Sequence, residues 1–142
     1  MELKWNLSEI YSTPQDLQAD INKLKQIGAD LLKTKGTLAT KQGLLNFYKL
    51  SENFSVLRDK ISSYLFLTKS LDGSNVFALE KIAELENYLQ QHSTKLTFAM
   101  QEIKKIPNKL LLQWAALVEF VNFDNDLKDI IKVKNLVKQL TK

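Results

Sequence analysis

The sequence predicts an all-α fold of about five helices, three of them long, packed as an antiparallel helical bundle or hairpin array. Apolar residues recur at spacings of three and four over long stretches, which is the period of an amphipathic helix. Only four glycines and two prolines interrupt the 142 residues, so tight turns are few and long helices are favoured. No stretch alternates apolar and polar residues as a half-buried strand does. We therefore expect one helical domain over residues 1–142.

The chain opens with a segment that we expect to be an extended arm, residues 1–12. It carries four large apolar side chains, Trp5, Leu7, Ile10 and Tyr11. Burial of these side chains would stabilise the fold by several kcal/mol, so we expect the arm to pack on the helices.

The first helix is expected over residues 14–35. Thr13 can cap its first turn, Pro14 fits the first helical position, and Gly36 suits the left-handed backbone that ends many helices. Gly28 lies within the apolar stripe, which indicates close contact with another helix. The stripe is Leu17, Ile21, Leu24, Gly28 and Leu31.

Two further long helices are expected over residues 40–71 and 76–105. The sequence Asp-Gly-Ser-Asn at 72–75 separates them, and each of these residue types favours turns, so the pair should form a helical hairpin. The apolar seam of the third helix comprises Ile82, Leu85, Leu89, His92, Leu96, Ala99 and Ile103.

Pro107 should end the third helix and allow a fourth to begin, over residues 108–120. A polar break at 122–126 and a last helix follow. The apolar residues of the last helix are Leu127, Ile130, Ile131, Leu136 and Leu140.

The amino-acid composition indicates the cellular compartment and excludes several kinds of functional site. The chain has no cysteine, which excludes disulfides, thiolate metal sites and cysteine nucleophiles and fits a reducing cytoplasm. The first residues are too polar for a secretory signal, and the longest apolar stretch, 110–123, is too short to cross a bilayer. We expect a cytoplasmic protein with no membrane partner.

The charge pattern argues against nucleic-acid recognition. The net charge is +4, but Arg58 is the only arginine among 20 basic residues, so bidentate contacts to phosphate or guanine are nearly missing. A basic run near the C-terminus could bind a membrane surface, although we favour an exposed, lysine-rich helix face. The run comprises Lys128, Lys132, Lys134, Lys138 and Lys142.

No complete catalytic site is present in the sequence. The only histidine, His92, is followed by Ser-Thr-Lys, so the His-Glu-x-x-His pattern of zinc peptidases is absent. We expect His92 at the edge of a helix seam. Neither a Gly-x-Ser-x-Gly turn for a serine nucleophile nor a glycine-rich phosphate loop occurs.

Two acidic groups are candidates for metal or catalytic sites. Asp124, Asp126 and Asp129 resemble the start of a calcium loop, but the central glycine of such a loop is missing and Asn135 occupies the position of the bidentate glutamate. The second group, Glu80, Glu84 and Glu86, is expected to be a solvated helix face. We expect no metal ligands and no cofactor in this chain.

A seven-residue segment near the N-terminus resembles the opening of oligoendopeptidase F and its relatives, zinc metallopeptidases of the thimet-oligopeptidase class. The segment is Trp5, Asn6, Leu7, Ser8, Glu9, Ile10 and Tyr11. The order of later elements, including the helix after Pro14 and the leucine-rich helix after Pro107, is similar in kind. In that family the zinc ligands lie several hundred residues downstream, and no position of this chain matches them.

The resemblance implies a non-catalytic N-terminal domain that forms one wall of a cleft admitting short peptides. Its partners would be its own catalytic domain and oligopeptides, and zinc would belong to that other domain. No substrate-binding residue is assigned. The candidates for cleft-lining residues are Tyr48, Tyr64 and Tyr88, and core packing is the favoured role of each. The alternative is a stand-alone helical interaction module.

Overall fold

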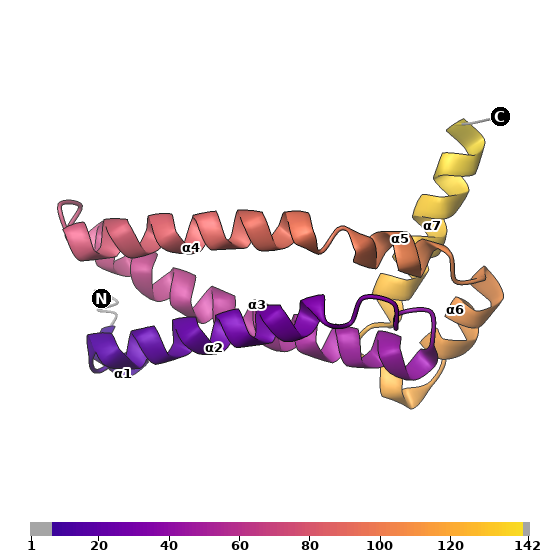
Figure 1. Cartoon of the computed structure of the whole chain (residues 1–142), viewed down its shortest axis with the longest axis horizontal. Helices are drawn as coiled ribbons and strands as arrows, with labels where there is room; N and C mark the ends of the chain where they lie inside the picture. The colour runs from indigo at the N-terminus through magenta and orange to yellow at the C-terminus, as the bar shows by residue number, and fades with distance from the viewer. Residues whose placement is uncertain (1–6, 141–142) are drawn as a thin grey trace, which may run out of the picture. The chain divides into compact units, whose positions relative to one another are not determined.

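The computed structural model describes residues 7–140, and its fold over these residues is all-α, without strands (Figure 1). The predicted fold class is confirmed. In chain order the elements are α1 (Leu7–Ile10), α2 (Pro14–Leu32), α3 (Lys41–Leu71), α4 (Val76–Lys95), α5 (Phe98–Lys104), α6 (Asn108–Ala115), the 3-10 helix η1 (Val118–Phe120) and α7 (Asp124–Leu140).

Contacts between Cα atoms divide the chain into two compact units. The first unit comprises residues up to Asp30 together with Ser51–Lys95, and the second comprises Leu31–Leu50 together with residues from Leu96 onward. Both α2 and α3 therefore contribute residues to each unit. The expectation of one domain over residues 1–142 stays a prediction.

The first unit is a packing of three helix segments from α2, α3 and α4. Polar contacts pair Asp20 of α2 with Lys60 of α3, whereas Lys25 of α2 pairs with Glu84 of α4. Later residues of α2 pair with later residues of α4, from Gln18 with Lys81 to Gly28 with His92, so these two helices are parallel. Figure 1 shows α3 running antiparallel to both. The predicted stripe of α2 is buried, and the hairpin turn at 72–75 is present.

The second unit combines the link between α2 and α3 and the start of α3 with the short helices α5, α6 and η1 and the longer α7. Its side chains buried to below 2% exposure include Leu38, Leu44, Ile106, Leu111 and Phe120. α7 packs on α5 and α6. This unit departs from the predicted element bounds more than the first one does.

The predicted third helix, 76–105, is interrupted at residues 96–97, between α4 and α5. The Thr94 hydroxyl donates a hydrogen bond of 3.1 Å to the carbonyl oxygen of Gln90. Such bonds from threonine to the preceding turn bend and weaken helices. The long continuous helix was therefore a wrong prediction, although the buried seam residues Ala99 and Ile103 were identified correctly.

The later boundaries also differ from the prediction. α6 ends at Ala115 because the backbone of Leu117 is extended, with φ −78° and ψ 143°. α7 begins at Asp124, so the polar break predicted for 122–126 is partly helical. Asp124 and Asp126 lie in the first turn of α7, where carboxylates interact favourably with the helix dipole.

The described part of the N-terminal arm is helical where an extended arm was expected. Residues Leu7–Ile10 form one helical turn, and the N–H of Tyr11 donates a hydrogen bond of 3.1 Å to the carbonyl oxygen of Leu7. Trp5 and Asn6 lie outside the described residues, so the docking of Trp5 stays a prediction.

Candidate functional site

The described part of the seven-residue motif is anchored to the first unit through Tyr11. Its hydroxyl donates a hydrogen bond of 2.7 Å to Asp20 Oδ2, and its ring meets the Tyr64 ring edge to face at 5.0 Å. Lys60 Nζ lies 3.1 Å from the same Asp20 oxygen and 4.7 Å from the centre of the Tyr11 ring. These contacts join α2, α3 and the end of the motif.

The electrostatics of this anchor favour a charged Asp20 and a neutral Tyr11. Burial by itself would raise the pKa of Asp20, but hydrogen bonds from Tyr11 and Lys60 and the Lys60 charge lower it overall. Burial raises the pKa of the Tyr11 hydroxyl, and the acceptor Asp20 raises it further. Because the Tyr11 hydroxyl and the Asp20 carboxylate already bind each other, we interpret this arrangement as a structural anchor.

An open groove of about 680 Å³ lies beside the anchor, between α1 and α3. Ile10, the motif residue before Tyr11, forms one side of it. The α3 side is Asp59, Ser62, Ser63, Phe66, Leu67 and Ser70. The volume falls within the range usual for small-molecule and peptide sites.

Sequence reasoning missed this groove. The signal was present, since Asp59, Ser62, Ser63, Phe66 and Ser70 recur at helical spacing along one face of α3. That face carries small hydroxyl side chains around one half-exposed phenylalanine.

His92 lies in the seam between helices, as the sequence suggested. It is 7% exposed, and its Nε2 atom is 2.9 Å from the carbonyl oxygen of Gly28. Its ring stacks on Phe54 at 5.0 Å and on Tyr88 at 5.7 Å. A histidine enclosed in this way is a packing residue of the first unit.

Gly28 permits the close contact of α2 and α4 at this point. A Cβ atom at residue 28 would lie 2.0 Å from the Tyr88 hydroxyl oxygen and 3.2 Å from the His92 ring. The prediction of a close helix approach at Gly28 is therefore confirmed.

The three tyrosines considered as cleft-lining candidates are all engaged in ring packing. Tyr64 contacts Tyr11, Tyr88 stacks on His92, and Tyr48 of the second unit stacks on Phe123 at 5.2 Å. Burial raises the pKa of Tyr88, and burial together with the Asp126 charge raises that of Tyr48. None of the three lines the groove.

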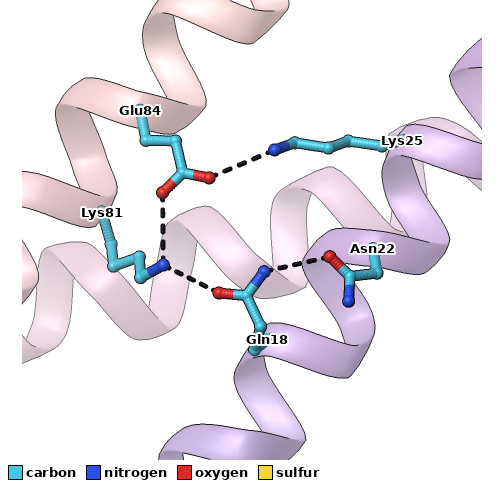
Figure 2. Close-up of polar contacts among 5 residues, drawn as sticks. All are labelled: Gln18, Asn22, Lys25, Lys81 and Glu84. Carbon is cyan, nitrogen blue, oxygen red and sulfur yellow. Dashed lines mark hydrogen bonds and ion pairs between the residues drawn. The ribbon is translucent and has the colours of Figure 1, made fainter.

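Glu84 belongs to a polar network along the edge of α2 and α4 (Figure 2). It accepts hydrogen bonds from Lys25 at 3.1 Å and from Lys81 at 3.2 Å. Lys81 also donates to Gln18 at 2.7 Å, and Gln18 donates to Asn22 at 3.0 Å. The hydrogen bond from Lys25 is the main cause that lowers the pKa of Glu84. Its neighbours Glu80 and Glu86 are exposed, so these three carboxylates form no paired site.

The acidic residues at the start of α7 are tied to neighbouring lysines. Asp124 pairs with Lys128 at 3.7 Å, and Asp129 pairs with Lys132 at 4.0 Å. Over residues 7–140, no group of three or more His, Asp or Glu side chains could hold a metal ion. In the same part of the chain, no helix has the length and apolar character needed to span a membrane.

The end of α7 exposes an apolar stripe, which we call the α7 stripe. Its members are Val133, Leu136, Val137 and Leu140, with exposed fractions of 45%, 56%, 48% and 77%. Lys134, from the basic run, points elsewhere, since its Nζ contacts the carbonyl oxygen of Ile106 and lies 2.9 Å from Asn108 Oδ1. Burial, and secondarily the charge of Lys138, lowers the pKa of Lys134.

Comparisons of the chain with family models, with curated proteins and with solved structures found no match. The groove and the α7 stripe are therefore interpreted from their own residues.

Proposed function

We propose that this chain is the non-catalytic N-terminal domain of an oligoendopeptidase F-like metallopeptidase, and that it forms one wall of the cleft that admits short peptides. Its role is to bind and position peptides and to exclude folded proteins sterically. The zinc and its ligands belong to a catalytic domain supplied by the rest of such an enzyme.

The observation that carries this proposal is the α7 stripe. Val133, Leu136, Val137 and Leu140 follow the spacing i, i+3, i+4 and i+7, which places them on one face of the helix. All four are at least 45% exposed. An apolar face of this kind is typical of a surface that packs against another domain or protein. A covering catalytic domain would bury these exposed side chains.

The groove beside the motif supports the proposed peptide role. It places Ile10 of the family-like segment against a face of α3 that offers both hydroxyl and apolar side chains. The cytoplasm is the compartment we propose, because a cysteine-free chain needs no oxidising environment.

A stand-alone helical interaction module is the second candidate, and the α7 stripe favours it as well. Its spacing is that of helix-in-groove recognition, in which a partner helix covers the i, i+3, i+4 and i+7 positions. In this case the partner would be a separate protein.

The reading frame of the gene separates the two candidates. The proposal expects the frame to continue beyond the Lys142 codon into a segment that encodes His-Glu-x-x-His and a downstream glutamate. A stop codon directly after Lys142 would overturn the peptidase proposal and favour the interaction module.

A further inference from the structure

The groove between α1 and α3 has a distinct chemical composition. Its apolar members are Ile10, Leu67 and Phe66, of which Phe66 is 47% exposed. The side-chain hydroxyls of Ser62 and Ser63 make no hydrogen bond to any other described residue. Among the described residues that line the groove, Asp59 is the only one with a charged side chain. A complementary ligand therefore combines a positive charge, hydrogen-bond donors and an apolar group.

Asp59, Ser62 and Ser63 can together surround one ammonium group. Their spacing of i, i+3 and i+4 places them on one face of α3. An ammonium carries three hydrogen-bond donors, and this face offers a carboxylate and two hydroxyl oxygens as acceptors. A planar guanidinium suits this arrangement less well, because it prefers to bind one carboxylate through two parallel bonds.

Arg58 does not close this site. Its side chain lies 3.2 Å from Asp59 Oδ1, but the pair is exposed, with 39% of the Arg58 side chain and 70% of the Asp59 side chain accessible. Such a pair contributes little to stability. The second carboxylate oxygen is left for a ligand.

The position of Phe66 relative to Asp59 sets the length of the ligand. Phe66 follows Asp59 by seven positions of α-helix, which corresponds to about 10 Å along the helix axis. An extended peptide covers that distance in about three residues. A peptide whose amino end lies at Asp59 would therefore bring its third side chain to Phe66.

We propose that the groove binds the free amino-terminal end of a short peptide with an apolar third residue. The ammonium contacts Asp59, Ser62 and Ser63, and the third side chain packs on Phe66. This inference rests on the proposed peptide role and adds the end of the peptide that is recognised and the side chain that is preferred.

The test is a titration of the full ¹⁵N-labelled chain with Ala-Ala-Leu-Gly-Ser-Gly-amide, followed by amide chemical shifts. We expect the largest shifts at Ser62, Ser63 and Phe66. Acetylation of the peptide's amino end, or Asp59→Asn in the protein, should weaken binding about tenfold or more, since each removes a charged hydrogen bond. Glu52→Gln is the matched control, because Glu52 is an exposed carboxylate of α3 outside the groove.

A second pair of measurements tests the preference for an apolar third residue. Replacement of the peptide's leucine by glycine should weaken binding to the original protein but not to Phe66→Ala. Phe66 is half-exposed, so this variant should remain folded, which circular dichroism checks.

Three results would overturn the inference: no binding, equal binding of the acetylated peptide, or equal binding of an acetylated peptide that begins with lysine. The last result would assign the site to a lysine side chain. None of them bears on the reading frame beyond Lys142, so failure of this inference and failure of the proposed function can be told apart.

Discussion

The two units of the chain are stabilised in different ways. In the first unit, long helices meet along continuous stripes, and the closest contact depends on Gly28 against Tyr88 and His92. In the second unit, short helices are joined by side chains that bind backbone groups far away in the sequence. Glu102 accepts hydrogen bonds of 2.9 Å from the N–H of Gly36 and of 3.4 Å from that of Leu38. The comparison shows that periodic helix packing is prominent in the first unit, whereas side-chain contacts to distant backbone groups add to the second.

The largest expected effect concerns the core of the second unit. Phe120 is completely buried, so Phe120→Ala should lower the free energy of unfolding by about 3–5 kcal/mol. Urea unfolding measures this, with Val118→Ala as the control because Val118 is 83% exposed. Amide hydrogen exchange should show the greater loss of protection in the second unit. Equal loss in both units would mean that they unfold together as one domain.

The next effect tests the close contact in the first unit. Gly28→Ala should destabilise the protein by about 1–3 kcal/mol, because its Cβ would collide with the Tyr88 hydroxyl. Alanine would otherwise favour a helix over glycine, so a loss of stability can come only from packing. Tyr88→Phe removes the hydroxyl and should restore part of the stability when combined with Gly28→Ala.

The control for this prediction is Gly73→Ala, since a Cβ there would meet only the Lys69 carbonyl oxygen at 3.9 Å. We expect little change in its urea midpoint. Destabilisation by Gly28→Ala that Tyr88→Phe does not relieve would contradict the packing account.

Glu102→Ala tests the hydrogen bonds that Glu102 accepts from the backbone between α2 and α3. The substitution leaves the N–H groups of Gly36 and Leu38 without their acceptor, which should cost about 1–3 kcal/mol. Hydrogen exchange should accelerate at these two amides, with little change across the first unit. Glu119→Ala is the control, because Glu119 is an exposed residue of η1. Unchanged hydrogen exchange at the Gly36 amide would contradict the proposed contribution of the Glu102 hydrogen bonds to stability.

The smallest effect is the pH dependence of the Tyr11 anchor. The pKa of Asp20 is lowered in the folded protein, so its contribution is present above the unfolded pKa of about 4 and is lost as pH falls through the folded value. Asp20→Asn should therefore lower stability at pH 7 by roughly 1 kcal/mol and much less at pH 2. Urea midpoints at both pH values measure this, with Glu52→Gln as the control. An equal loss at both values would show that the Asp20 charge is unimportant.

The sequence predicted the first unit better than the second, for a physical reason. The stripe of Leu17, Ile21 and Leu24 follows from helical periodicity alone, and so does the seam position of His92. The break between α4 and α5 involves a local hydroxyl bond, and Glu102 binds the N–H of Gly36, which is 66 residues away. Neither leaves a periodic signal.

The candidate site was only partly predictable for the same reason. The motif pointed to Ile10 and Tyr11, but the groove arises from the side-by-side placement of α1 and α3, which spacing along one helix does not reveal. For Tyr48, Tyr64 and Tyr88 the sequence favoured core packing, which agrees with their ring contacts. Their partners Phe123, Tyr11 and His92 become visible only in the fold.

The proposed function assigns peptide binding to this chain and catalysis to another domain. The most direct test is to incubate the pure chain with zinc and a quenched-fluorescence oligopeptide and to follow the fluorescence. The account predicts no cleavage, because the His-Glu-x-x-His ligands and base are absent from the sequence. Turnover by the pure chain that a metal chelator abolishes would contradict it.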